Sequence, residues 1–403
     1  MKRIIIFMLL PVFFVLIADK AYVYAYDAKE HVSDQIEEFK SKTKCSAVSV
    51  AVVDGDKTEV YGDAGLYQIG SMTKAFTGLA VQKLIAEEML SKDDTVSELL
   101  PGFTAVYGHE AFDITIEQLL KQTSGYTNSE KLYPSASDDM TLIEWTDSIS
   151  GKELSFKPGE KYSYSNVNYN LLGAVIEKVS GLSYREYMET NILIPLGLTN
   201  TYVVTPGDGA NIIRGSRPGY RHAFKYEIPI APGQIPAGYF YSNVNDMARW
   251  IGIWLGSADI PEEYEILLSA VKSELKEPED YYSGWESFEN GTTGHSGGTP
   301  NYSSRIVFSE EKKIGVCVLT NMNVAASTDS LCNGIYAAFS GDDTVRIAGD
   351  VWTVFDLIFS AVTIFWVLLI IIVLFIKRRG TLLVAGILSV IVLLSICIVM
   401  PLV

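Results

Sequence analysis

Cysteine and histidine are scarce in this sequence. The chain of 403 residues contains four of each. The cysteines form no Cys-x-x-Cys pair, and the histidines show none of the short spacings that are typical of zinc sites. Cys45, Cys317 and Cys332 lie outside the apolar chain ends, and three thiols can form at most one internal disulfide. We therefore expect no metal and no other cofactor.

Basic residues are also few. The chain has 32 Lys and Arg against 48 Asp and Glu, which gives a net charge of −16. Without the two chain ends, residues 26–350 carry a net charge near −20. A surface of this sign repels nucleic acid and anionic lipid headgroups. The composition therefore argues against a nucleic-acid partner, but it indicates neither the fold nor an oligomeric state.

The first 25 residues have the pattern of a secretory signal. Lys2 and Arg3 precede an apolar run over 4–18, and Val23-Tyr24-Ala25 has the small and apolar residues expected before a cleavage point. The run is about 15 residues long, which is short for a helix that spans a bilayer. We expect residues 1–25 to be a signal peptide, with an uncleaved anchor as the alternative.

The last part of the chain is strongly apolar. Residues 357–376 and 382–403 contain no charged residue, and each run is long enough to cross a bilayer. Between them stand three cations, Lys377 to Arg379, which favour the cytoplasmic side of a membrane. We expect residues 346–403 to form a transmembrane hairpin that leaves the preceding domain outside the cell. Two buried core helices are the less suitable alternative for runs this long.

Residues 26–345, which lie between the two apolar ends, are predicted to form one domain. Strand patterns lie near its beginning, at 45–53 and 58–61, and near its end, at 282–288 and from 291 to 320. Helical patterns fill the middle of the segment. This order predicts an α/β (α+β) fold, in which a mixed antiparallel sheet is built from both ends and flanked by helices, with an inserted all-helical subdomain.

One serine opens an apolar helical pattern. Ser71 follows Gly70, and apolar residues then recur at helical spacing as far as Met89 and Leu90. Lys74 lies three residues after Ser71, so both side chains project from the same face of the first turn. A lysine whose pKa is lowered by burial can take the proton of a serine hydroxyl and make it a nucleophile.

The Ser-x-x-Lys pattern is weak when taken alone, because it occurs five times. Only the copy at Ser71 has a glycine before it and an apolar helix after it. A serine at a helix start with a solvated lysine is the alternative for this copy. The other copies lie in charged stretches typical of solvated surface: Ser41/Lys44, Ser269/Lys272, Ser273/Lys276 and Ser309/Lys312.

Several segments, taken together, point to one family. In chain order they are IGSMTKAFTGLAVQKL, LSKDDTVSELLP, ITIEQLLKQTSG, KPGEKYSYSNVNYNLLGAVIEKVSG, PAGYFYSNVNDMARW and TGHSGGTPNYSSRIVF. With these segments, residues 35–340 resemble the serine β-lactamase and penicillin-binding superfamily, specifically its class C-like branch. That branch includes esterases, D-amino-acid peptidases and low-molecular-weight penicillin-binding proteins.

The resemblance implies catalytic roles for particular side chains. Ser71 would be the acylated nucleophile and Lys74 its partner in proton transfer. Tyr164 would share a proton with Lys74 and later protonate the leaving group, while Asn166 would hold Lys74 and the amide carbonyl of the substrate. A second Tyr-Ser-Asn tripeptide stands at 241–243, and we favour the first copy because its surroundings match the family better.

A third element of the family is a strand with Lys-Thr-Gly or a variant. Here the tripeptide begins at His295 and ends at Gly297, and the resemblance places the oxyanion hole at the backbone N–H groups of Gly298 and the nucleophilic serine. Glycines would let the substrate lie against the strand. β-Lactamases of this branch usually have lysine in place of His295. A neutral imidazole recognises a β-lactam carboxylate less well, although Arg305 is close enough in sequence to replace the lost cation.

The sequence therefore predicts a membrane-tethered, extracytoplasmic serine hydrolase of a bacterial cell membrane. It would act through an acyl-enzyme on small peptide-like amides or esters, as a D-amino-acid peptidase, carboxypeptidase or esterase. The C-terminal hairpin resembles that of membrane-bound prodrug-activating peptidases. A penicillin-binding sensor that is acylated without turnover, and a true β-lactamase, are the alternatives.

Overall fold

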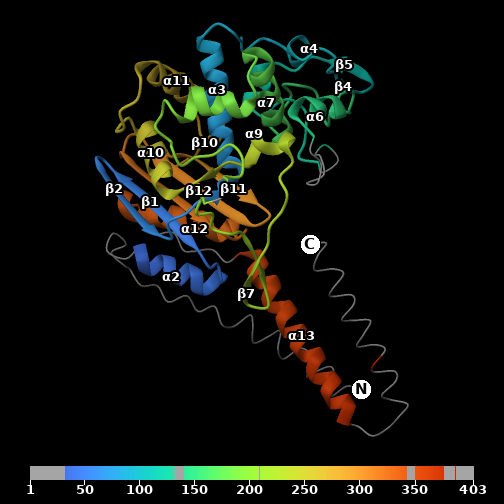
Figure 1. The fold of residues 1–403 in the computed structure, drawn as a ribbon, viewed down its shortest axis with the longest axis vertical. Helices are drawn as coiled ribbons and strands as arrows, with labels where there is room; N and C mark the ends of the chain where they lie inside the picture. Colours follow the sequence, from blue (N-terminus) through green and yellow to red (C-terminus); the bar gives the residue numbers. More distant parts are fainter. Residues whose placement is uncertain are drawn as a thin grey trace.

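The computed structural model describes residues 32–129, 132, 140–207, 209–342, 350–375 and 386. The predicted signal peptide and all but one residue of the second predicted membrane span lie outside these residues. The domain consists of a central sheet covered by helices, and the long helix α13, Val351–Phe375, projects away from it (Figure 1).

A seven-stranded antiparallel sheet forms the centre of the domain. Its strand order is β2-β1-β13-β12-β11-β10-β9. In that order the strands are Lys57–Gly62, Val48–Asp54, Ile314–Thr320, Tyr302–Ser309, Thr293–Thr299, Trp285–Ser287 and Tyr281–Tyr282. Val48 of β1 lies opposite Thr320 of β13, so strands from the two ends of the domain are neighbours. This confirms the predicted α+β fold with a sheet built from both ends.

Helices cover both faces of the sheet. On one side lie α2 and α12, and on the other lie α10 and α3 (Figure 1). Their bounds are Val32–Thr43, Ala325–Ser340, Val244–Leu255 and Thr73–Ala86. The central strands are therefore buried on both faces, which explains why every residue of β1 from Val48 to Val53 is buried.

The side chains of β1 alternate between two separate cores. Val48, Val50 and Val52 pack with α2 and α12. Ala51 and Val53 belong to the larger core, which also contains α3, α10 and helix α7, Asn166–Ser180. Successive residues of a strand point to opposite faces, so one short segment supports both layers. The larger core includes the apolar face of α3 and thereby fixes the helix that carries the Ser-x-x-Lys motif.

The inserted subdomain is mainly helical, but the prediction that it is all-helical was wrong. Its elements are α4 Val96–Leu99, β4 Ala105–Tyr107, β5 Glu110–Phe112, α5 Ile116–Leu120, α6 Leu142–Ile149, α7 Asn166–Ser180 and α8 Tyr184–Met188. β4 and β5 form a hairpin whose turn residues, Gly108 and His109, both have positive φ. Such a two-residue turn matches the twist of paired strands and allows a hairpin between short segments.

Short elements connect the two parts. They are β3 Tyr67–Gln68, the 3₁₀ turn Gly70–Met72, the π-helical turn Glu189–Leu193, β6 Ser216–Gly219, β7 His222–Lys225, the 3₁₀ turn Pro232–Gln234, α9 Ile235–Gly238, β8 Tyr241–Ser242 and α11 Glu262–Lys272. β3 pairs with β8, and β6 pairs with β7 in a hairpin next to α13.

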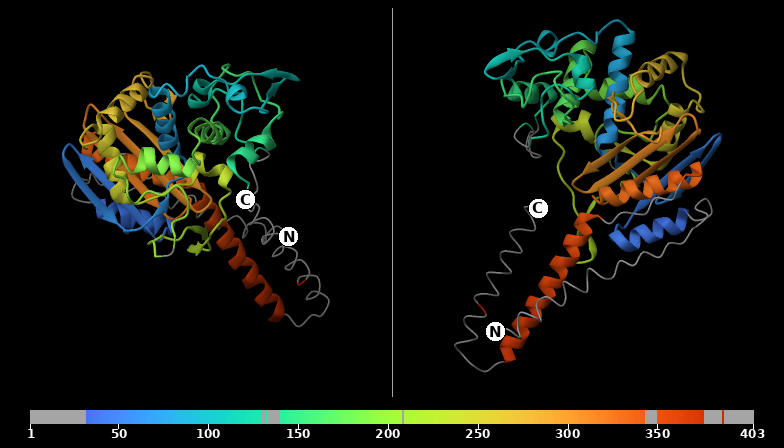
Figure 2. Two further views of the ribbon diagram at one scale, coloured as in Figure 1. Left: turned by 45° about the horizontal axis from the view of Figure 1, so that its top comes forward. Right: turned by 180° about the vertical axis from the view of Figure 1, so that it is seen from behind.

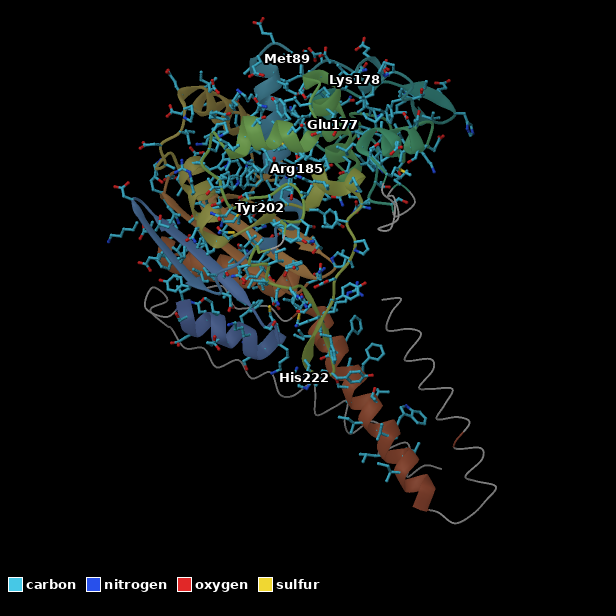
Figure 3. All side chains as sticks on the ribbon, in the orientation of Figure 1. Met89, Glu177, Lys178, Arg185, Tyr202 and His222 are labelled. Carbon is cyan, nitrogen blue, oxygen red and sulfur yellow. The ribbon has the colours of Figure 1, made fainter. Side chains whose placement is uncertain are left out.

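Two predicted elements differ in extent from the sequence pattern. Helix α3 ends at Ala86, because Glu88 takes a positive φ, and Met89 is left exposed beyond the helix end (Figure 3). The strand predicted at 282–288 is divided between β9 and β10. The division falls at Ser283 and Gly284, which both have positive φ and form the turn of a hairpin whose backbone lies against α3.

Helix α13 begins before the first predicted membrane span, 357–376, and covers it up to Phe375. It contacts the β6–β7 hairpin, where Arg221 donates its backbone N–H to Asp356 over 2.8 Å, and then extends away from the domain (Figure 2). Among the residues described by the structure, no helix is long and apolar enough to cross a membrane. The transmembrane hairpin stays a prediction.

None of the three cysteines in the described part of the domain forms a disulfide. Cys45, Cys317 and Cys332 are all buried and unpaired. Burial raises the pKa of each thiol above its ordinary value. They behave as small apolar side chains of the core, and none has the lowered pKa of a reactive cysteine.

A buried polar network fixes the start of helix α7. Asn168 accepts a hydrogen bond from the hydroxyl of Ser124 and donates to Oε1 of Gln122. The same Oε1 accepts the backbone N–H of Ser165 over 2.9 Å. Because Ser165 immediately precedes α7, this network ties the loop after α5 to the helix that begins with Asn166.

We expect Asn168→Leu to destabilise the domain by about 1–3 kcal/mol, because the hydroxyl of Ser124 loses its buried acceptor. The matched variant is Asn170→Leu, two residues further along α7. Neither amide atom of Asn170 has a hydrogen-bond partner within the described residues, although the side chain is fully buried. Leucine at position 170 should therefore leave the stability unchanged or raise it.

The free energies of unfolding of both variants can be compared by urea titration of the full-length chain. Equal losses of unfolding free energy in the two variants would contradict a stabilising role of this network. They would show that the hydrogen bonds of Asn168 add nothing beyond the effect of changing the shape of a buried side chain.

Candidate active site

Ser71 lies in a tight turn between β3 and α3. Gly70 before it has a φ of +52°, and a Cβ atom placed there would be 2.4 Å from the backbone nitrogen of Gly298. Only glycine permits this approach. The turn that carries Ser71 is therefore packed directly on β11, and the backbone N–H groups expected to form the oxyanion hole come from two segments in direct contact.

Lys74 is fully buried beneath Ser71. Its Nζ donates to Oγ of Ser71 over 3.0 Å, to Oδ1 of Asn166 over 2.7 Å and to the carbonyl oxygen of Ala237 over 2.5 Å. Burial lowers the pKa of Lys74 well below its ordinary value, and the charge of Glu286 opposes this shift only in part. A lysine whose pKa is lowered in this way can take the serine proton as a general base.

Tyr164 and Asn166 reach the lysine from the start of α7. Ser165 caps the helix, with its Oγ accepting the N–H of Val167 over 3.3 Å. The cap places Asn166 in the first turn, where it binds Lys74, and leaves Tyr164 just outside the helix. The Nζ of Lys74 lies 4.8 Å from the centre of the Tyr164 ring. The structure thus brings together the four side chains for which the resemblance implies catalytic roles.

The second Tyr-Ser-Asn copy has different surroundings. Tyr241 and Ser242 form β8, and the hydroxyl of Tyr241 accepts a hydrogen bond from Gln68 over 2.8 Å. Asn243 caps α10 by accepting the N–H of Asp246 over 2.9 Å. These contacts hold the β3–β8 pair and the start of α10 in place, so the second Tyr-Ser-Asn copy has a structural role.

His295 lies on β11 against the rings of Tyr164 and Tyr281, with ring centroids 6.0 and 5.8 Å away. Its Nδ1 lies 2.6 Å from the carbonyl oxygen of Ser296, and its Nε2 lies 3.3 Å from the hydroxyl of Tyr281. Because a carbonyl can only accept, Nδ1 carries the proton of the neutral ring. Burial, followed by the charge of Lys74, lowers the pKa of His295 to about 3, so the imidazole is neutral at physiological pH.

Arg305 does not take the place of the missing cation. It lies directly opposite Ser296 in the β11–β12 pair, and opposed residues point to the same face of a sheet, which is the face away from His295. There Arg305 donates to Oγ of Ser296 over 2.9 Å, and this hydroxyl donates to Asp329 over 2.9 Å. Burial raises the pKa of Asp329, and the charge of Arg305 opposes that shift. Arg305 is part of a buried network behind the strand.

Gly297 and Gly298, two neighbouring glycines of β11, have different environments. A Cβ atom at Gly297 would lie 2.1 Å from the carbonyl oxygen of Ile69, so this glycine is required for packing against the segment before the nucleophile turn. A Cβ atom at Gly298 would meet nothing within 4 Å. A substrate therefore has space beside Gly298, whereas the missing side chain of Gly297 lets the strand pack closely against residue 69.

A cavity of about 190 Å³ opens above Ser71. It is bordered by side chains of α7 and by the backbone of α9, and no charged residue lines it. Its lining residues are Ser71, Asn166, Asn170, Gln234, Ala237, Gly238, Tyr239 and Gly298. Over the residues that the structure describes, no three potential metal ligands lie together.

Sequence reasoning missed the contribution of α9 and of Asn170. Ala237 binds Lys74 through its backbone oxygen, which no side-chain pattern reveals. Tyr239 follows α9 and borders the cavity. Asn170 lies four residues after Asn166 in α7, so helical spacing alone places both on one face and could have identified it.

Comparison with known proteins agrees with this geometry. The beta-lactamase family model matches residues 32–337. Protein flp of Staphylococcus aureus (strain MRSA252) is 34% identical over 284 residues, covering 67% of this chain and 55% of that protein. Penicillin-binding protein 4* of Bacillus subtilis (strain 168) is 28% identical over 268 residues, covering 60% of this chain and 57% of its own length. The chain spans about half the length of the curated relatives it matches.

Solved structures show the same fold. An octameric penicillin-binding protein homologue from Pyrococcus abyssi matches with a TM-score of 0.69 and 26% identity, covering 78% of each chain. A class C beta-lactamase matches with a TM-score of 0.66 and 18% identity, covering 81% of this chain and 100% of its own. At that identity the second likeness concerns the fold only. Through the family match over residues 32–337, this chain belongs to the beta-lactamase family, within the superfamily of penicillin-binding serine hydrolases.

Proposed function

We propose that this chain is a membrane-tethered serine hydrolase that cleaves peptide-like amides or esters through an acyl-enzyme. The observation that carries the proposal is the contact of Lys74, fully buried and with a lowered pKa, with the hydroxyl of Ser71. A buried lysine with a lowered pKa is typical of a general base.

In the proposed reaction, neutral Lys74 takes the proton of Ser71 as Oγ attacks the carbonyl carbon of the substrate. A tetrahedral intermediate forms, and its oxyanion receives hydrogen bonds from the backbone N–H groups of Ser71 and Gly298. The bond to the leaving group then breaks. The proton passes from Lys74 through Tyr164 to the leaving nitrogen or oxygen, and the acyl group stays on Ser71.

Deacylation repeats the steps with water. A water molecule enters as the leaving group departs and gives its proton to the Lys74–Tyr164 pair as it attacks the ester carbonyl. The acid is released, and the proton returns to Oγ of Ser71. Asn166, held by Lys74, is placed to donate its amide N–H group to a carbonyl of the substrate.

The neutral state of His295 favours amide and ester substrates over β-lactam antibiotics. A β-lactam presents a carboxylate that needs a cation, and burial keeps the imidazole uncharged. Arg305 points to the other face of the sheet. The name penicillin-binding protein 4* of one relative supports acylation by penicillin as a second activity, with or without turnover.

The proposals of a membrane tether and of an extracytoplasmic location are based on the two ends of the chain. An uncharged run over 357–376, followed by three cations and a second uncharged run, supports a membrane hairpin with the catalytic domain outside the cell. Exposed apolar side chains along α13 also support it, among them Val354, Ile358, Phe365 and Leu368. The pattern at 1–25 supports the same orientation independently.

We expect Ser71→Ala to abolish labelling by a fluorophosphonate probe and to lower ester hydrolysis by about 10⁴-fold or more, because no other group supplies the nucleophile. Ser269→Ala is the matched control, since it removes the serine of another Ser-x-x-Lys copy and should change neither readout. Labelling of the full-length chain can be located by mass spectrometry. An adduct that persists in Ser71→Ala would show that the nucleophile lies elsewhere.

Tyr164→Phe should lower kcat/KM by about 10²- to 10⁴-fold, because the hydroxyl that completes the proton path is lost. Tyr241→Phe removes the same group from the second copy. It should leave kcat/KM within about threefold of the wild type and cost about 1 kcal/mol of stability, since Gln68 loses its buried acceptor. Steady-state kinetics and urea unfolding of both variants separate the two roles, and the opposite pattern would mean that the second copy is catalytic.

The wild-type chain should hydrolyse short p-nitrophenyl esters with a higher kcat/KM than nitrocefin. The ratio between the two substrates should also stay constant when the pH falls from 8 to 5.5, because the pKa of His295, about 3, keeps the imidazole neutral over that range. A histidine with an ordinary pKa near 6.5 would gain charge and improve nitrocefin binding on acidification. Initial rates at each pH measure the ratio, and a preference for nitrocefin would identify a β-lactamase.

A further inference from the structure

A cationic segment interrupts the acidic sequence of the domain. Arg214, Arg217, Arg221 and Lys225 stand within 12 residues that contain no Asp or Glu. Residues 26–350 as a whole carry a net charge near −20. The structure places this segment in the β6–β7 hairpin and just before it. The hairpin is therefore a part of the domain where the sign of the charge is reversed.

The hairpin is held to the domain at its base. Ser216 donates both its backbone N–H and its hydroxyl to the carbonyl oxygen of Asn321, each over 2.7 Å. Ala223 packs against the core between α2, α12 and the sheet. Because alternate residues of a strand point to opposite faces, His222 and Phe224 point away from that core. The outer face of β7 is thus presented to the surroundings on a fixed support.

The turn of the hairpin displays bulky side chains. Tyr220 and Arg221 have φ values of +49° and +63°, which a two-residue hairpin turn requires and which Asn and Gly adopt at less cost. Tyr220 is 43% exposed, and Phe224 is 52% exposed. Arg221, His222 and Lys225 are exposed beside them. Aromatic and basic side chains therefore gather at a turn where folding alone favours Asn-Gly, which indicates a contact with another surface.

The position of this turn is fixed relative to helix α13. Asp356 is the last charged residue before the uncharged run 357–376, and its Oδ2 accepts the backbone N–H of Arg221 over 2.8 Å. The turn is therefore level with the point where α13 changes from polar to apolar. Figure 3 shows His222 at the end of the domain from which α13 projects. A bilayer entered by the run 357–376 would have its headgroups at the height of the turn.

We propose that the β6–β7 hairpin contacts the surface of a bilayer that contains anionic lipids. Tyr220 and Phe224 lie among the headgroups, and the side chains of Arg221 and Lys225 bind lipid phosphates. The proposal rests on the membrane tether of the proposed function. It adds a second contact beside the tether, which holds the domain in one orientation on the bilayer.

Three arguments favour a lipid surface as the partner. Aromatic side chains with a polar end are enriched where membrane and water meet. Basic side chains close to an anionic bilayer are attracted to it one by one, whatever the charge of the distant parts of the protein. The acidic remainder of the domain is repelled by the same surface, so both effects turn the hairpin toward the bilayer. The tether also brings the hairpin to a bilayer in every copy of the chain.

The test uses the full-length chain reconstituted in vesicles of phosphatidylcholine, alone or mixed in equal parts with phosphatidylglycerol. A bimane fluorophore is attached at His222→Cys. Cys397 is replaced by serine in every variant, and the three thiols of the domain are buried. Phosphatidylcholine with a nitroxide on its headgroup quenches a fluorophore that reaches the headgroup layer. The control position is Lys178→Cys, which is exposed at the opposite end of the domain (Figure 3).

We expect quenching in the mixed vesicles to be about threefold or more stronger at position 222 than at position 178, because only the hairpin reaches the headgroups. Arg221→Gln combined with Lys225→Gln should lower the ratio of bound to free hairpin about tenfold or more, since each cation near an anionic surface contributes about fivefold. This loss should be largest in the mixed vesicles. Phe224→Ser should weaken quenching in both kinds of vesicle, because it removes an apolar contact.

The matched control combines Lys178→Gln with Arg185→Gln. It removes two exposed charges from the end of the domain opposite the hairpin and should leave quenching at position 222 unchanged (Figure 3). All of these variants should hydrolyse short p-nitrophenyl esters in detergent at the wild-type rate, which shows that the domain is folded.

Two outcomes would overturn the inference. One is quenching at position 222 that does not exceed quenching at position 178. The other is strong quenching that neither the double variant of Arg221 and Lys225 nor Phe224→Ser reduces, because the tether alone would then keep the hairpin near the bilayer. A full-length chain that does not float with the vesicles would instead overturn the proposed membrane tether, so the two failures are distinguishable.

Discussion

The burial of the side-chain nitrogen of Lys74 organises the site. Lys74 Nζ is removed from water and lies within hydrogen-bonding distance of three separate segments: the nucleophile turn, the first residue of α7 and the backbone of α9. In the neutral amine, two N–H groups serve the oxygen atoms of Asn166 and Ala237, and the lone pair is left for the hydroxyl of Ser71. Each segment is therefore placed with respect to the others by the same nitrogen atom.

The sheet and the inserted subdomain meet at Lys74. β11 supplies the wall on one side, where the backbone of residue 70 touches Gly298, and α7 supplies the other wall. The network of Asn168 holds the start of α7 to the loop after α5, which keeps Tyr164 beside the lysine. The electrostatics follow from the same packing: burial lowers the pKa of both Lys74 and His295, and the two groups would repel each other if both were charged.

The position of α13 links the chemistry to the end of the chain. Asp356 binds the β6–β7 hairpin with one oxygen, and its neighbours Phe355 and Phe359 line a cavity of about 670 Å³. The helix that is proposed to enter the membrane therefore shares this cavity with Tyr239 and Gly298, which also line the catalytic cavity.

The sequence by itself determined the sheet built from both ends, the family and the motif at Ser71 and Lys74, because apolar periodicity and short spacings are local properties of the chain. It favoured the Tyr-Ser-Asn copy that begins at Tyr164 because of its neighbouring segments. It could not decide between Arg305 and an uncharged site, because that question depends on which face of the sheet each side chain occupies. It also missed the β4–β5 hairpin, whose turn uses a histidine at positive φ, and the carbonyl of Ala237. Only tertiary packing decided these, since the burial that shifts the pKa values of Lys74 and His295, and that leaves Asp356 half satisfied, arises from residues far apart in the chain.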